Sequence, residues 1–342
     1  MIELKQDSLI FSFGDVHPDA RLGIEFQRTL RIPDDEKDYP LPPGLGPFPL
    51  KLVDDYAKDV PKPWVEHGGV FLPMYQSEAM WINFQDFHIA DRGASYPFAV
   101  KIAAGKINAV TGESWDNELG RSPQDYLVSP KQPWLDGYCV EKGFIRQFVA
   151  MPLGAGYSAE EQLTGFAEYG GVQIVVYPMK REVFERRFPK HKPGRFDDSR
   201  TLGMACESLS AQFDMGLAPG GRMRQEIYDD PYGIEDWDQN YRSRCFVHIA
   251  NSMVWRSITG ENPPTVPPTA KEYTKAGFPW FDYYSDGKAL EGSSKLKNLK
   301  SIFKLGKDKK DVPLPENEPV NPENVVKIIG KIKESQVREG NF

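Results

Sequence analysis

The chain has 342 residues, 40% hydrophobic and 27% charged, so it can bury a sizeable core in one large or two ordinary domains. It contains no run of about 18 uncharged apolar residues, which excludes a transmembrane helix. The first seven residues lack the basic start and apolar core of a secretory signal, so we expect none. The net charge of −7 argues against a nucleic-acid partner.

Strand patterns dominate residues 1–180. Residues 8–13 and 23–32 alternate apolar and polar side chains at period two, which is typical of half-buried strands, and the composition of 14–19 predicts a turn between them. Further strands are predicted at 98–105 with 106–112 as a hairpin, at 144–153, and at 171–178, the clearest strand because it is β-branched and bounded by Gly and Pro.

Two proline-rich segments punctuate the chain. Residues 40–47 fit neither a helix nor a central strand, because proline fixes φ and removes a donor, so we expect an ordered, extended surface loop. Residues 262–269 are interpreted as a second proline-rich tether.

The basic stretch 181–200 predicts a short helix followed by a linker. We place a boundary there, between a β-rich lobe at 1–180 and a second β-rich lobe at 201–285. Within the second lobe, 223–228 and 245–250 have strand patterns.

The last segment, 286–342, is predicted to be a helical C-terminal arm. Leu296, Leu299, Ile302 and Phe303 recur at helical spacing. Asn321-Pro322-Glu323 then resembles a helix start, with Val325, Ile328, Ile329 and Ile332 as an apolar stripe that ends near Gln336. We expect this arm to dock on a folded surface, either its own core or a neighbouring subunit. Together the patterns predict an α+β, β-rich fold of antiparallel sandwich- or barrel-like sheets, with few short helices and this arm.

Three cysteines, Cys139, Cys206 and Cys245, lie far apart and form no Cys-x-x-Cys pair. Such spacing and an odd count do not make a disulfide framework, so we expect buried structural thiols and a cytoplasmic protein. The five histidines form no His-x-His or His-Glu-x-x-His pair, so the spacing indicates no zinc site.

Asp15 and His17 follow a strand, in the order that opens the metal cluster of calcineurin-like metallophosphoesterases. That site also needs downstream Gly-Asp-x-x-Asp, Gly-Asn-His-Glu and Gly-His-x-His motifs, and the sequence has none of them. We therefore interpret the pair as a turn whose side chains cap backbone groups, with a metal site as the alternative.

The densest acidic segment is 229–238, in which Asp229, Asp230, Asp236 and Asp238 are candidate ligands for a hard cation. The alternating spacing of an EF-hand loop is absent, so a solvated acidic loop is the preferred interpretation. No metal or other cofactor is expected.

Residues 153–159 (LGAGYSA) formally fit a dinucleotide-binding fingerprint. Ser158 and Glu161 predict a capping box, but the helix that it starts must end by Gly165 or Gly170, too soon to cross a parallel sheet. We expect a glycine corner and a one-turn helix instead.

Aromatic residues cluster at 278–284 (FPWFDYY) and at 133–138 (PWLDGY). Such clusters bury large areas and commonly fix a loop to a core, and they also serve as anchors at interfaces. The sequence leaves both interpretations open.

Five segments are familiar together: 41–46 (LPPGLG), 73–81 (PMYQSEAMW), 100–109 (VKIAAGKINA), 147–158 (QFVAMPLGAGYS) and 277–282 (GFPWFD). They resemble a family of bacterial and fungal proteins of unknown function, some of which carry a ubiquitin-like extension. The resemblance covers most of residues 20–305. It implies no activity, so no catalytic residue is carried over.

The sequence supports an architecture rather than a reaction. We expect a soluble, non-enzymatic protein that acts through binding or self-assembly, with other copies of itself as the expected partner. The alternative is a hydrolase whose site is assembled from residues distant in sequence, and the sequence identifies no catalytic residue for it.

Overall fold

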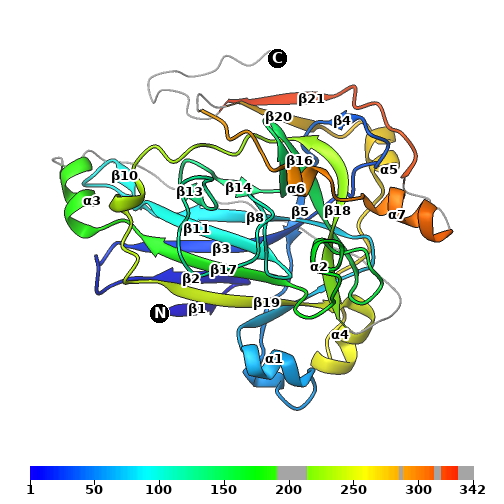
Figure 1. The fold of residues 1–342 in the computed structure, drawn as a ribbon, viewed down its shortest axis with the longest axis horizontal. Helices are drawn as coiled ribbons and strands as arrows, with labels where there is room; N and C mark the ends of the chain where they lie inside the picture. Colours follow the sequence, from blue (N-terminus) through cyan, green and yellow to red (C-terminus); the bar gives the residue numbers. More distant parts are fainter. Residues whose placement is uncertain (191–213, 285–287, 312–316, 330–342) are drawn as a thin grey trace.

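The computed structural model describes residues 1–190, 214–284, 288–311 and 317–329. Two large sheets dominate these residues and pack around a common apolar core (Figure 1), which confirms the predicted β-rich α+β class. Phe26 and Ile82 from one sheet and Val100 and Ile174 from the other belong to this core and are at most 1% exposed.

The first sheet has ten strands: β1 (Ile2–Lys5), β2 (Ser8–Ser12), β3 (Arg21–Thr29), β4 (Asp38–Tyr39), β5 (Gly44–Pro47), β8 (Ala79–Asp86), β14 (Trp134–Leu135), β15 (Gly137–Glu141), β16 (Phe144–Pro152) and β18 (Met215–Arg224). The main path runs β1-β2-β3-β8-β16-β18-β4. Its pairings are antiparallel except that of β18 with β4. The strands expected at 8–13, 23–32 and 144–153 are confirmed.

The second sheet has seven strands: β6 (Lys51–Leu52), β7 (Val70–Met74), β11 (Phe98–Ala104), β12 (Ile107–Asn108), β13 (Leu127–Ser129), β17 (Val172–Pro178) and β19 (Ser243–Asn251). Their order is β12-β11-β17-β19-β7-β6, with β13 beside β11 and a parallel pairing of β19 with β7. The predicted strands at 98–105, 171–178 and 245–250 are confirmed. The hairpin after residue 105 is short, because β12 pairs over only two residues.

Strands from both sides of the predicted linker belong to the same sheets. β16 pairs with β18, and β17 pairs with β19. The described residues on the two sides of the linker, 1–180 and 214–284, therefore build the two sheets jointly and not one lobe each. The short basic helix is confirmed as α3 (Arg181–Arg187), and residues 191–200 lie outside the described part of the chain.

β18 begins eight residues before the strand expected at 223–228 and ends at Arg224. The prediction missed its start because the sequence MGLAPGGRMR lacks a strand pattern. The glycines allow close packing. A Cβ at Gly220 would lie 2.5 Å from Val149 Cγ2, and one at Gly221 would lie 2.4 Å from the carbonyl oxygen of Pro33. Packing against neighbours therefore outweighs the low strand propensity of glycine.

The helices are short: α1 (Lys62–His67), α2 (Ala159–Thr164), α3, α4 (Ser252–Thr259), α5 (Ala270–Lys275), α6 (Ser294–Lys297), α7 (Ile302–Lys309), and the 3-10 turns η1 (Asp54–Tyr56) and η2 (Ile234–Asp236). α2 has the predicted capping box of Ser158 and Glu161, and it ends at Gly165 in the left-handed conformation. None of the helices in the described ranges is long and apolar enough to cross a membrane.

The helix expected from Asn321 is wrong. Val325–Ile329 forms a strand, β21, which pairs in parallel with β20 (Trp280–Tyr284). Val325, Val326, Ile328 and Ile329 are β-branched and suit a strand, and pairing with β20 outweighs the helix-start signal. Another two-stranded pair joins β9 (His88–Ile89) and β10 (Ala94–Ser95).

The described part of the C-terminal arm docks on its own chain. The expected helix at 294–305 is two helices, α6 and α7, because Ser301 caps the start of α7 by accepting a hydrogen bond from the Lys304 amide. Leu296 is fully buried, and Ile302 and Leu305 pack with Val149 in a small apolar cluster. In this single chain the described part of the arm therefore docks intramolecularly, which is one of the two alternatives that we predicted.

Both proline-rich segments contact the rest of the chain. Leu41 is 8% exposed and exchanges backbone hydrogen bonds with Phe281, and residues 44–47 form the edge strand β5. The surface-loop prediction is therefore wrong for Leu41. In the second segment, the carbonyl oxygens of Pro264 and Thr265 accept hydrogen bonds from Tyr75 Oη and Arg28 Nη2.

Candidate functional site

Asp15 and His17 occupy the turn that the sequence predicted. Asp15 is exposed, whereas His17 is 4% exposed and packs against the rings of Tyr96 and Phe184. His17 Nδ1 accepts a hydrogen bond from the Asp19 amide at 3.1 Å, and burial lowers its pKa. His17 therefore acts in packing and backbone capping.

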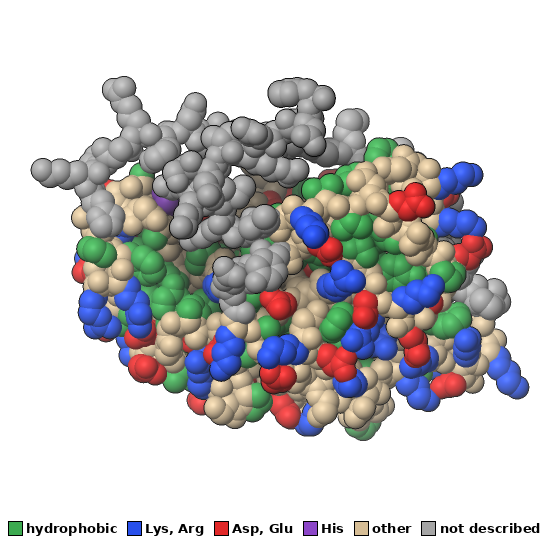
Figure 2. Space-filling view, turned by 90° about the horizontal axis from the view of Figure 1, so that it is seen from above, with side chains coloured by type: hydrophobic (Ala, Val, Ile, Leu, Met, Phe, Trp, Pro, Cys, Tyr) green, Lys and Arg blue, Asp and Glu red, His purple; other side chains and the backbone are tan. Residues whose placement is uncertain are grey.

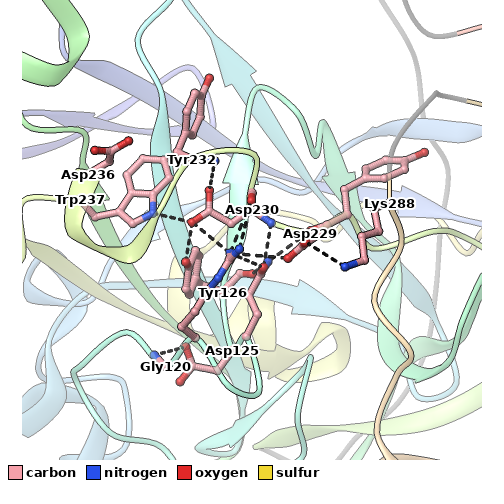
Figure 3. A network of polar contacts seen from close by, with 12 residues as sticks. Gly120, Asp125, Tyr126, Asp229, Asp230, Tyr232, Asp236, Trp237 and Lys288 are labelled. Atoms are coloured by element: carbon pink, nitrogen blue, oxygen red, sulfur yellow. Dashed lines mark hydrogen bonds and ion pairs between the residues drawn. The ribbon is translucent and has the colours of Figure 1, made fainter. Parts of the chain in front are cut away.

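The acidic segment 229–238 is not the solvated loop that we expected. Asp230 is 4% exposed, and its Oδ2 accepts hydrogen bonds from Tyr126 Oη at 2.6 Å and from Trp237 Nε1 at 3.0 Å (Figure 3). Arg121 Nη1 lies 3.4 Å from the same oxygen. Tyr126 and Arg121 lie more than 100 residues from Asp230 in the sequence, so spacing within the acidic segment could not reveal that the carboxylate is internally paired.

The other acids of this segment also have protein partners. Asp229 lies near Arg121 and Lys288, Asp236 pairs with Arg187 at 2.7 Å, and Asp238 accepts from the Asn240 amide. No group of three or more His, Cys, Asp or Glu side chains suited to a metal occurs among the residues that the structure describes.

A pocket of about 230 Å³ lies where β8, β14, β20 and β21 meet the segment Leu41–Gly44. Its lining is mostly apolar and aromatic, with a single carboxyl group. The residues that line it are Leu41, Pro42, Pro43, Gly44, Trp81, Trp134, Asp136, Phe281 and Ile328. We call it the Asp136 pocket.

Two tryptophans form adjacent walls of the Asp136 pocket. The ring centroids of Trp81 and Trp134 lie 6.3 Å apart with their planes at 72°. Trp134 is held on another side by Tyr283, at 4.7 Å and 71°. Gly44 allows the close approach of the loop, since a Cβ there would lie 3.3 Å from Trp81 Cζ2.

Asp136 is 5% exposed, and its Oδ2 accepts a hydrogen bond from Trp134 Nε1. Its backbone is fixed by hydrogen bonds to the Gln225 side chain and from the Phe148 amide. Burial raises the pKa of the carboxyl from 3.8 to about 7, and the Trp134 hydrogen bond opposes this rise. The group can therefore change its charge near neutral pH.

The end of the molecule that carries β20 and β21 has a mixed surface. Seen from above in Figure 2, hydrophobic side chains lie between Lys or Arg side chains and Asp or Glu side chains, with both signs interspersed. Ile328 of the Asp136 pocket is 42% exposed, which places part of the lining at this surface.

Sequence reasoning singled out the surrounding segments but not the pocket. Leu41–Gly44, Trp81 and Phe281 belong to segments that carry the family resemblance, and Trp134 and Asp136 belong to the aromatic cluster at 133–138. The sequence feature that could have pointed to Asp136 is its position inside an aromatic cluster. That the segments around it converge on one pocket is visible only once the strands are paired.

Asp214 is a partly buried carboxyl that is internally satisfied. Its oxygens accept hydrogen bonds from Trp64 Nε1 at 3.2 Å and from the Met215 amide at 2.9 Å, and burial raises its pKa to about 6. Trp64 stacks on His248, whose pKa burial lowers to about 3. These contacts indicate a structural role.

Cys139 and Cys245 are buried and free. Burial raises the pKa of both thiols to about 12, which disfavours the reactive thiolate. Cys206 lies outside the described residues. Comparison of the chain with protein-family models, with curated proteins and with solved structures found no match.

Proposed function

We propose that the protein is a soluble, non-enzymatic binding protein whose ligand enters the Asp136 pocket. The observation that carries this proposal is a buried, titratable carboxyl in the lining of a pocket that the indoles of Trp81 and Trp134 also line. An apolar concave site with one convergent polar group and a perturbed pKa is the usual form of a small-ligand site.

The hydrolase alternative is less well supported at this pocket. Hydrolysis by paired carboxylates uses two acids, one as the proton donor and the other as the base or nucleophile. Asp136 is the single ionisable side chain in the described lining. Its neighbours are rings and prolines, which bind ligands well and do not transfer protons.

Self-association and a cytoplasmic location stay part of the proposal. The free, buried thiols of Cys139 and Cys245 are compatible with a reducing compartment. Measurement of the native mass over a range of protein concentrations tests self-association. A monomer at every concentration would contradict it and leave the pocket proposal standing.

The experiment that tests the binding proposal is a ligand screen by NMR, in which signals of cationic, neutral and anionic small molecules report contact with the protein. Wild type is compared with Trp81→Ala, which removes one wall of the pocket, and with Phe166→Ala. Phe166 is 71% exposed and does not belong to the lining, so it is the matched control.

We expect compounds that bind wild type and Phe166→Ala but not Trp81→Ala, and we expect them to be recovered chemically unchanged. Hits that bind all three proteins equally would contradict the pocket as the site. Conversion of a hit into a product, lost in Asp136→Asn, would favour the hydrolase.

A further inference from the structure

We propose that the Asp136 pocket recognises an alkylated ammonium group, that is, a small organic cation or a cationic end of a larger ligand. This inference rests on the proposed binding function and adds the chemical class of the ligand. It draws on three features of the pocket: the ring geometry, a carboxyl that has no basic partner among the described residues, and the volume.

The ring geometry suits a cation with apolar substituents. Trp81 and Trp134 meet at 72°, and Phe281 lines the same cavity, so rings bound it on several sides. Ring faces attract a cation through their quadrupole, most strongly for tryptophan, and the methyl groups of an alkylated ammonium gain apolar contact with them. A hydrated metal ion would lack this second contribution.

The carboxyl supplies the opposite charge. In the described residues Asp136 accepts one side-chain hydrogen bond, from Trp134, and forms no ion pair with a basic side chain. A buried carboxylate without a cation is costly, so a bound cation would favour its charged form. The net charge of −7 also attracts cations over a longer range.

The groups that face Asp136 from neighbouring elements are neutral: Gln225 after β18, Trp81 on β8, Phe281 on β20, Ile328 on β21, and Pro42 and Pro43. The charged residues nearby, Arg224, Glu226, Asp282 and Lys327, line an adjacent cavity that shares Ile328. Binding that depends on pH near neutrality is therefore assigned to Asp136.

The volume limits the size of the group. About 230 Å³ is below the 300–1,000 Å³ of sites that hold drug-sized ligands. The pocket therefore suits a head group of a few carbon atoms, with the remainder of a larger ligand passing over Ile328 to the surface.

The test uses two probes of the same shape, choline and its neutral carbon analogue 3,3-dimethyl-1-butanol, titrated calorimetrically into wild type in sodium phosphate–citrate buffers. We expect choline to bind at least tenfold more tightly than the alcohol at pH 8.5. Choline affinity should fall about 30-fold at pH 5.5, because a carboxyl of pKa about 7 loses about that factor of its ionised form. The alcohol should show no such fall.

Three variants separate the contributions. Asp136→Asn keeps the shape and should remove both the preference for choline and the dependence on pH. Trp81→Ala should weaken both probes, and Asp55→Asn, an exposed acid on η1, is the control and should change neither. Circular dichroism verifies that each variant is folded.

Equal affinity for the two probes, or choline binding that Asp136→Asn leaves unchanged, would overturn the inference. The binding function is judged separately, by the ligand screen. If other compounds bind in a Trp81-dependent way while choline does not, the ligand class proposed here is wrong and the binding function stands. If no compound depends on Trp81, the binding function itself fails.

Discussion

The conservative substitution Asp136→Asn should change the free energy of unfolding by an amount that shifts in favour of the variant as the pH rises. The folded-state pKa of Asp136 is about 7, against 3.8 for an ordinary aspartate. A group whose pKa is raised by folding destabilises the folded state when it is ionised. Wild type therefore loses stability as the pH rises from about 4 to 7, and the asparagine variant has no such loss.

The magnitude follows from the two pKa values. Each tenfold change in proton affinity is worth about 1.4 kcal/mol, so the ionised carboxyl costs the fold about 4 kcal/mol at pH 8. At pH 5 the corresponding cost is roughly 1–2 kcal/mol. The variant loses about 1–3 kcal/mol of stability if the hydrogen-bond donors of the asparagine amide stay unpaired, and this loss does not depend on pH. The difference in the free energy of unfolding between variant and wild type should therefore grow by about 2–3 kcal/mol from pH 5 to 8.

Urea unfolding at pH 5, 6, 7 and 8 in sodium buffers measures this difference directly. Amine buffers are avoided, because a cation in the pocket would reduce the cost of the charge. A difference that is constant over this range would refute the reasoning, since it would mean that Asp136 titrates as an ordinary hydrated aspartate.

Three further substitutions test the packing. The Glu78 side chain is 1% exposed, and Arg28→Met removes its ion-pair partner at 2.8 Å, which should lower the free energy of unfolding in urea by about 3–5 kcal/mol. The double variant Arg28→Met with Glu78→Gln should lose less, and equal losses would contradict this. Ile302→Ala should lower stability by about 2–5 kcal/mol with an unchanged native mass, and a changed mass would indicate docking on another subunit. Cys139→Ser should change only stability, and native Cys139 should resist alkylation at pH 8, so rapid labelling would argue against a buried thiol.

Strands with a regular pattern could be predicted from the sequence, and their pairing could not. Residues 171–178 are rich in β-branched side chains and contain β17. Met215–Arg224 has a glycine-rich sequence and is a strand because neighbours pack closely on Gly220 and Gly221. At Val325–Ile329 the same residues suited a helix stripe and a strand, and the partner strand β20 decided between them. The local pattern of a segment therefore allows more than one secondary structure, and contacts with segments distant in sequence determine which one forms.

The candidate site was harder to predict for the same reason. The spacing of Asp15 and His17 and of the acids at 229–238 resembled ligand patterns. In the structure Asp15 is exposed, and the other side chains contact rings, amides and basic groups of the protein. Asp136 has no motif partner. Its properties come from burial among Trp81, Trp134 and Phe281, which are separated by up to 200 residues in the sequence.

One wall of the Asp136 pocket is tied to the core through alternating residues of β20. Two-stranded sheets are marginally stable alone, so β20 and β21 need anchors. Trp280 is fully buried, and the next residue, Phe281, exchanges backbone hydrogen bonds of 2.7 and 2.9 Å with Leu41. Because successive side chains of a strand point to opposite faces, Trp280 anchors the sheet while Phe281 lines the pocket. Movement of the β20 backbone at Phe281 would also displace Trp280, so the packing of Trp280 helps to keep this aromatic wall close to Asp136.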